Sequence, residues 1–316
     1  MRTHCLAVLS SLSLAALGCG GSSSAAAESS TPPTTAATTA ATVAPASSAS
    51  PAPPPETPGN IVSTTPPPAD AEGRLRWVLA GEQRTEKEKA RDAYRHPAET
   101  LAFFGVKPDS KVVELWPGGG WYTALLAPLV RDRGKLAVTN ADPNVATGNQ
   151  KAGAEKYNAK LHGAPAVYDQ VEVRVVNPPQ SLTLGPDGSA DIVLTFRNIH
   201  NWMGAGYADK VFAAAFQVLK HGGTFGVEEH RAAPGTTAKK STETGYVAEE
   251  TVIQLAKAAG FVLDAKSEIN ANPKDTKDYP KGVWTLPPTL ELGAADREKY
   301  LAIGESDRMT LRFKKP

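Results

Sequence analysis

Hydrophobic positions along the chain change their spacing several times, and each change predicts a different element. Short runs of Val, Ile and Leu, typical of buried strands, alternate with longer stretches in which apolar residues recur at helical intervals. We expect strands at residues 112–115, 136–139, 171–176, 191–196, 224–227, 261–267 and 309–313, and helices at residues 86–94, 98–104, 121–130, 145–161, 207–219 and 248–259. This alternation suits right-handed β-α-β units, so it predicts an α/β fold with a mostly parallel, seven-stranded sheet and helices on both faces.

The segment between the last two expected strands has neither helical nor alternating periodicity. Because it replaces a crossover helix, we expect the last strand to run antiparallel and to form a hairpin at the edge of the sheet. Residues 270–292 contain prolines and exceed the length of an ordinary connection, and such loops often cover binding sites. The residues then expected over the pocket are Lys274, Asp275, Lys277, Asp278, Tyr279 and Trp284. Alternatively, the segment only braces the domain by packing Trp284 on the core.

The first residues have the pattern of an export signal. Arg2 and His4 precede an apolar run at residues 6–17, which is too short to span a bilayer permanently and leads to Gly18 and Cys19. The sequence Ala-Leu-Gly-Cys resembles the cleavage box of bacterial lipoproteins, in which the cysteine becomes the lipidated first residue. We therefore expect a signal peptide at residues 1–18 and an exported, periplasmic or cell-envelope lipoprotein whose lipidated cysteine anchors it to a membrane. Secretion without lipidation is the alternative.

Composition changes sharply after this box. Residues 19–71 consist mainly of Ala, Ser, Thr and Pro, which cannot bury a core, so we expect a disordered tether. Residues 72–316 have a globular composition and are expected to fold alone as one domain, to which the tether adds no stability.

Charge and cysteine content exclude several classes of function. The formal charge of the 316-residue chain is only +1, and the absence of a basic run disfavours nucleic acid as a partner. Both cysteines, Cys5 and Cys19, precede the expected domain, so the domain has no disulfide, cysteine nucleophile or thiolate metal site. The sequence leaves the oligomeric state open.

The stretch KVVELWPGGGWY is the clearest candidate for ligand binding. An apolar strand containing Glu114 is followed by a loop with Gly118, Gly119 and Gly120 and then by a helix. Glycines let the backbone approach a nucleotide-like ligand closely. A carboxylate beside the loop does not suit a pyrophosphate, and neither the P-loop nor the dinucleotide-binding spacing is present. The stretch instead resembles the first motif of class I S-adenosylmethionine-dependent methyltransferases, with Trp116 in place of the first motif glycine.

Four further segments extend this resemblance to nearly the whole domain. Residues 196–202, 218–230, 270–278 and 282–288 are similar to a bacterial group known only as predicted methyltransferases. The resemblance implies the Rossmann-like class I methyltransferase fold, S-adenosylmethionine as cofactor and methylation of a small molecule that it does not identify. The cofactor is made in the cytoplasm, however, and an exported enzyme would need a supply of it. The alternative is a non-catalytic exported protein that binds another ligand in the same cleft.

The resemblance also implies which residues hold the cofactor. Those of the first motif are Glu114, Trp116, Gly118, Gly119 and Gly120, and Arg197 is expected in the cofactor site as well. The ribose hydroxyls need a hydrogen-bond acceptor after the second strand. Asn140 stands at the position where the family has its acidic residue, whereas Asp142, two residues later, has the carboxylate that offers two acceptor oxygens. Asn177, after the third strand, is the expected acceptor of the adenine amine.

Two histidines are candidates for the chemistry. His200 and His230 follow the fourth and fifth strands, whose carboxyl ends meet at the ligand-binding edge of an open sheet. Histidine can take a proton from an acceptor near neutral pH, and Glu229 is expected to assist. A purely structural role for these residues is the alternative. A metal-dependent hydrolase built on them and Glu228 is a weaker hypothesis because no recognised ligand spacing is present, so we expect no metal.

Two further groups are expected near the cleft. Basic and aromatic residues of the first helices either face a substrate or form a solvated surface: Arg91, Tyr94, Arg95 and His96. Three tryptophans are expected around one cleft, where they either stack on a ligand or fill space: Trp116, Trp121 and Trp202.

Overall fold

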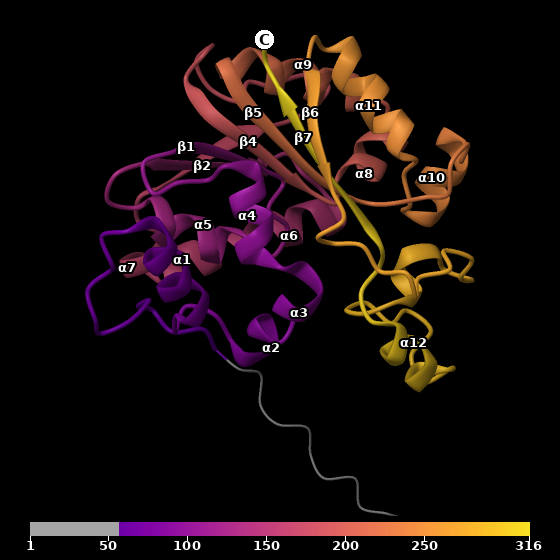
Figure 1. The fold of residues 1–316 in the computed structure, drawn as a ribbon, viewed down its shortest axis with the longest axis horizontal. Helices are drawn as coiled ribbons and strands as arrows, with labels where there is room; N and C mark the ends of the chain where they lie inside the picture. Colours follow the sequence, from indigo (N-terminus) through magenta and orange to yellow (C-terminus); the bar gives the residue numbers. More distant parts are fainter. Residues whose placement is uncertain (1–56) are drawn as a thin grey trace, which may run out of the picture. The chain divides into compact units, whose positions relative to one another are not determined.

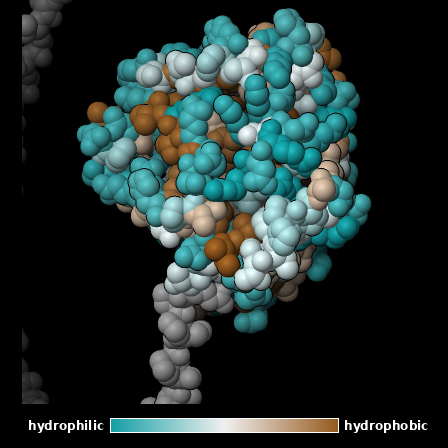
Figure 2. All heavy atoms as spheres, turned by 90° about the vertical axis from the view of Figure 1, so that its left-hand side faces the viewer, coloured by the Kyte–Doolittle hydropathy of each residue, from teal (hydrophilic) through white to brown (hydrophobic). Residues whose placement is uncertain are grey.

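The computed structural model describes residues 57–316. The expected signal peptide, Cys19 and residues 19–56 of the expected tether lie outside the described residues. No helix within 57–316 is long and apolar enough to cross a membrane. Hydrophilic residues predominate on the face shown in Figure 2, where apolar residues gather in a few small patches.

A seven-stranded sheet with the order β3-β2-β1-β4-β5-β7-β6 forms the centre of the domain (Figure 1). The strands are β1 (Lys111–Leu115), β2 (Lys135–Ala141), β3 (Val171–Val176), β4 (Ala190–Phe196), β5 (Leu219–His230), β6 (Val262–Ser267) and β7 (Arg308–Lys314). Neighbouring strands are parallel, except that β7 runs antiparallel to both β5 and β6. This confirms the expected α/β fold and its antiparallel last strand. Since β7 lies between β5 and β6, the edge itself is formed by β6.

Helices cover both faces of the sheet, as expected (Figure 1). They are α1 (Ala71–Ala80), α2 (Glu86–Lys89), α3 (Asp92–Arg95), α4 (Pro97–Phe104), α5 (Thr123–Val130), α6 (Gly148–Gly163), α7 (Pro165–Tyr168), α8 (Ile199–Gly204), α9 (Ala208–Val218), α10 (Ala238–Thr244), α11 (Glu249–Ala258) and α12 (Arg297–Ile303), with a short 3₁₀ helix, η1 (Gly282–Thr285). One hydrophobic core lies between the sheet and α1, α4, α5, α6 and α7, and a second lies beneath α8, α9 and α11. Along β1, Val112 enters the first core and Val113 the second, because successive side chains of a strand point to opposite faces.

Several helices differ from the expectation. The expected helix at 86–94 is divided into α2 and α3, although the capping box formed by Thr85 and Glu88 is present. The left-handed backbone of His96 (φ 39°) then ends α3, and Pro97 begins α4. Five helices were not expected: α1, α7, α8, α10 and α12. They have at most ten residues, which is shorter than the window of about 11–18 residues over which a helical apolar period is clearest.

Residues immediately before position 72 pack on the domain. The Val62 side chain is 8% exposed and belongs to the first hydrophobic core. The Gly59 N–H donates to the Glu82 carbonyl at 2.6 Å, and Asp70 caps α1 by accepting from the Gly73 N–H at 2.6 Å. The described end of the expected tether is therefore part of the folded structure.

Candidate active site

A cavity of about 460 Å³ lies at the carboxyl edge of the sheet, where β1, β4 and β5 end. Its walls come from the loop after β1, the start of α8, α3, the first residue of β7 and the segment 283–289. Open parallel sheets bind their ligands at this edge, and the volume suits a small molecule.

The glycine loop keeps an open surface toward this cavity. Gly118 has a left-handed backbone (φ 58°), and a Cβ added at Gly118 or Gly119 would meet no atom within 4 Å. Trp116 is also left-handed (φ 44°), so the backbone retains a conformation that favours glycine although the residue is tryptophan. Its indole packs against the rings of Trp202 and Tyr207, with centroids 5.1 and 6.4 Å away. The Trp116 side chain therefore forms part of the cavity wall.

Glu114 and Gly120 lie beneath the loop and do not line the cavity. The Glu114 carboxylate is fully buried and accepts a hydrogen bond from Thr123 Oγ1 at 2.6 Å. Burial raises the pKa of this carboxyl to about 7. A Cβ at Gly120 would lie 2.9 Å from Tyr157 Cε2 of α6. Neither residue lines this cavity, because β1 turns Glu114 toward α5 and Gly120 lets the loop pack on α6. Their contact with a cofactor stays a prediction.

The expected ribose and adenine residues also lie outside the cavity. The Asn140 side chain is committed to protein contacts, since Nδ2 donates to Asn158 Oδ1 at 3.1 Å and Oδ1 accepts from a backbone N–H. Asp142 uses Oδ1 for a turn with Asn144, and its Oδ2 has no hydrogen-bond partner among residues 57–316. Asn177 is exposed and bridged to Ser181. Of the two ribose candidates, the geometry favours Asp142.

His200 and Glu229 form a buried pair at the cavity. His200 Nδ1 lies 3.2 Å from Glu229 Oε1. The carboxylate is itself fixed by the backbone N–H groups of Ile199 and His230, at 2.6 and 2.9 Å. When Nδ1–H donates to Glu229, Nε2 keeps a lone pair, and the ring lines the cavity. This arrangement can orient an imidazole that takes a proton from a bound ligand.

His230 lies beside His200 but has a different environment. The two ring centroids are 5.7 Å apart, and His230 Nδ1 lies 2.5 Å from Ser306 Oγ. Burial, the neighbouring His200 and Arg308 lower the pKa of His230 well below its usual value. His230 is therefore neutral at pH 7 and lines the cavity as a hydrogen-bonding group.

The side chains considered for a metal are engaged otherwise. Within 57–316, no three His, Cys, Asp or Glu side chains are grouped as metal ligands. Glu228 accepts from the Tyr122 hydroxyl at 2.9 Å and from Arg197 Nη1 at 3.3 Å. The geometry gives no support to the metal-dependent hydrolase.

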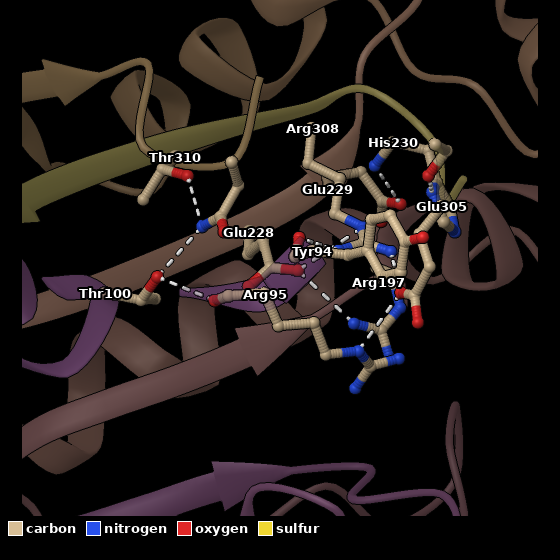
Figure 3. Close-up of polar contacts among 12 residues, drawn as sticks. Tyr94, Arg95, Thr100, Arg197, Glu228, Glu229, His230, Glu305, Arg308 and Thr310 are labelled. Carbon is tan, nitrogen blue, oxygen red and sulfur yellow. Dashed lines mark hydrogen bonds and ion pairs between the residues drawn. The ribbon is translucent and has the colours of Figure 1, made fainter. Parts of the chain in front are cut away.

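Arginines from three parts of the chain meet at the cavity: Arg91 and Arg95 at the two ends of α3, where Arg91 is the N-cap, Arg197 after β4, and Arg308 at the start of β7. Glu305 accepts from Arg91 Nε at 2.5 Å and from Arg95 Nε at 3.1 Å, and it pairs with Arg308. Figure 3 shows three of these arginines, Arg95, Arg197 and Arg308, beside the buried carboxylates Glu228 and Glu305.

The contributions of Glu305 and Arg308 were not foreseen. The sequence did contain a signal for them, because the residues before an antiparallel last strand lie at the edge where the parallel strands end. In the sheet register, Arg308 stands opposite His230. Of the other basic and aromatic residues expected to face a substrate, Tyr94 and His96 do not line the cavity.

The long segment after β6 covers the cavity with its second half only. Trp284 lines the cavity together with Val283 and residues 287–289, and its ring meets His200 edge-on at 5.9 Å. The other residues expected over the pocket do not line it: Lys274, Asp275, Lys277, Asp278 and Tyr279. Asp275 is buried and instead accepts from the Tyr246 hydroxyl and the Asp307 N–H. The first half of the segment is thus a brace.

Only two of the three tryptophans expected around one cleft line the cavity. Trp116 and Trp121 line the cavity, whereas Trp202 is 1% exposed and lies behind Trp116.

No protein-family model and no curated protein matches the chain. Solved structures are similar to it in fold. One is a SAM-dependent methyltransferase from Aquifex aeolicus, at 14% identity and a TM-score of 0.47, covering 72% of this chain and 93% of that one. Another is an arsenic(III) S-adenosylmethionine methyltransferase from Chlamydomonas reinhardtii, at 15% identity and 0.46, covering 79% and 74%. A third is a geranyl diphosphate methyltransferase in complex with SAM, at 15% identity and 0.46, covering 79% and 92%. These likenesses concern the Rossmann-like fold alone.

Proposed function

We propose that the protein is an S-adenosylmethionine-dependent methyltransferase that acts on a small molecule. The observation that carries this proposal is the open glycine loop, which keeps its left-handed backbone beside a cavity that is also lined by His200, the partner of buried Glu229. When bound, S-adenosylmethionine would supply an electrophilic methyl group to a nucleophile of the acceptor, and its sulfur would keep the electron pair of the carbon–sulfur bond.

The chain's own residues have distinct roles in this proposal. Gly118 and Gly119 give the methionine end of the cofactor access to the backbone, because neither position has a side chain to fill the space. Asp142 lies outside the cavity, but its Oδ2 has no hydrogen-bond partner among residues 57–316 and is the proposed acceptor for the ribose hydroxyls. His200 takes the acceptor's proton at Nε2, and Glu229 orients the imidazole and stabilises its charged form. Trp284 covers the cavity and limits the entry of water.

A second candidate function has its own supporting observation. Asn140 is tied to α6, and the Trp116 indole forms a wall where the motif of the family has glycine. These features fit an exported protein that binds another ligand in the cleft without catalysis.

Calorimetry with S-adenosylhomocysteine separates the two candidates. We expect the purified protein to bind it with a micromolar dissociation constant, equivalent to about −8 kcal/mol. Gly118→Val should abolish this binding, because the side chain would occupy the cavity. Gly235→Val is the matched control, since Gly235 is also left-handed and open (φ 76°) but does not line the cavity. Absence of heat from folded wild-type protein would remove the methyltransferase proposal and leave the binding protein.

A further inference from the structure

We propose that the acceptor molecule carries an anionic oxyacid group, a carboxylate or a phosphate, and that the guanidinium groups of Arg91 and Arg197 bind it. This inference deepens the proposed function by defining its substrate class. That the bound molecule is the methyl acceptor rests on the proposed function. The anion-binding site itself follows from the charges and hydrogen bonds around the cavity.

The cavity wall has more guanidinium groups than carboxylates to pair with them. Glu88 is paired with Lys160 at 3.2 Å, and Glu229 with His200 at 3.2 Å. Four arginines therefore share the two remaining carboxylates, Glu228 and Glu305. An additional anion would balance this cluster.

Arg91 and Arg197 keep donors free for such an anion. Arg91 uses only Nε, toward Glu305, and Arg197 uses only Nη1, toward Glu228. Their other guanidinium nitrogens have no hydrogen-bond partner among residues 57–316. Each side chain is about one-fifth exposed, at 21% and 20%, and lines the cavity. A guanidinium with a free edge suits the two oxygens of a carboxylate or phosphate.

Arg95 adds a buried positive charge behind them. Its side chain is 2% exposed and stacks on Trp121 at 4.6 Å, and its Nη1 has no hydrogen-bond partner within 57–316. Burial and the nearby Arg197 lower the pKa of this guanidinium well below its usual value, so the surroundings do not fully compensate its charge. A bound anion would reduce the electrostatic cost of keeping Arg95 protonated.

The backbone of Arg197 places these charges next to the proposed base. Arg197 is left-handed (φ 61°), and its N–H donates to the Glu228 carbonyl at 2.8 Å. His200 follows three residues later and lines the same cavity. A molecule held by its anionic group at Arg197 can therefore present a second group, the nucleophile, to His200.

Titration with inorganic phosphate tests the site directly. We expect wild-type protein to bind phosphate with a millimolar or tighter dissociation constant in calorimetry, both without and with saturating S-adenosylhomocysteine. Arg91→Lys and Arg197→Lys preserve the charge that pairs the buried Glu305 and Glu228, so both variants should fold. Each should bind phosphate about tenfold more weakly, a loss of about 1.4 kcal/mol, because lysine lacks the planar fork.

Arg312→Lys is the matched control. Arg312 is also a partly buried arginine that pairs with a carboxylate, Asp264, but it does not line this cavity. We expect this variant to bind phosphate as tightly as wild type. An equal loss in Arg312→Lys, or absence of phosphate binding by wild type, would overturn the anion site.

Two outcomes distinguish this inference from the proposed function. If S-adenosylhomocysteine binds and phosphate competes with it, the arginines serve the cofactor's own carboxylate and the inference fails while the methyltransferase stands. If phosphate binds with the expected dependence on Arg91 and Arg197 but S-adenosylhomocysteine does not bind, the anion site stands and the methyltransferase proposal fails.

Discussion

Two residues other than glycine hold left-handed backbone at the ends of neighbouring strands. Trp116 follows β1 with φ 44°, and Arg197 follows β4 with φ 61°. This conformation costs an L-residue about 1–2 kcal/mol, and such strain concentrates at functional sites. Ring packing offsets the cost at Trp116, and a hydrogen bond to the Glu228 carbonyl offsets it at Arg197. Both residues border the cavity, which supports its assignment as the site.

Glu114 should make stability depend on pH. Burial raises its folded-state pKa from 4.5 to about 7, so the folded protein holds this proton more tightly than the unfolded chain does. The resulting contribution to the free energy of unfolding is fully present below pH 4.5 and is lost as the pH rises through 7. At 1.36 kcal/mol per pKa unit, the loss is roughly 3 kcal/mol. Glu114→Gln should therefore be more stable than wild type at pH 8.5 and similar at pH 4.5 in urea unfolding. If the difference in free energy of unfolding between the two proteins stayed constant across this pH range, Glu114 would not have a raised pKa.

His200 and Glu229 should affect turnover and not cofactor binding. His200→Ala should lower kcat by about 10²- to 10⁴-fold, the usual contribution of a general base, while the dissociation constant for S-adenosylhomocysteine changes less than about twofold. Glu229→Gln should lower kcat too, because the amide can reverse the imidazole's preferred tautomer. His221→Ala, at the opposite edge of the sheet, is the control. If His200→Ala weakened S-adenosylhomocysteine binding by as large a factor as it lowered kcat, this histidine would belong to the cofactor site instead.

At the scale of elements, α3 and β7 build the charged wall. Arg91 and Arg95 are four residues apart, a spacing that brings side chains to one helical face, and both reach Glu305. Because β7 is antiparallel, its first residue, Arg308, stands opposite His230 at the carboxyl end of β5. The site therefore depends on the antiparallel direction of β7 as well as on the glycine loop after β1.

The segment before α1 should contribute measurable stability. Deleting residues 20–70 removes buried Val62, worth about 1.5–3 kcal/mol, and the Asp70 cap, worth about 1 kcal/mol. At about 2–4 °C per kcal/mol, the melting temperature should fall by roughly 5–15 °C. Deleting residues 20–56 should leave it unchanged. Equal melting temperatures for both deletions would show that the original expectation of a tether without stabilising contacts was right for its whole length.

At the scale of the whole molecule, we propose that Cys19 is lipidated and anchors the protein to a membrane. The proposal rests on the apolar run at 6–17 and the small residue Gly18 before the cysteine. Labelled fatty acid supplied to a bacterial host should appear in the wild-type protein, and membranes should retain it. Cys19→Ala should be unlabelled and released. A Cys19→Ala protein that stays labelled and membrane-bound would refute the lipid anchor.

The sequence by itself determined the sheet and the loop that gives the site its location. Apolar periodicity predicted all seven strands, and the missing crossover helix predicted the direction of β7, because these features depend on local spacing and connection length. The glycine loop was visible for the same reason. Only the tertiary structure decided which side chains reach the cavity. Side-chain direction keeps Glu114 and Asn140 out of the cavity lining. Strand pairing brings Arg308 to the cavity, although it lies more than a hundred residues from Arg197 in the sequence. Contacts across such separations follow from packing and register, which no local pattern encodes.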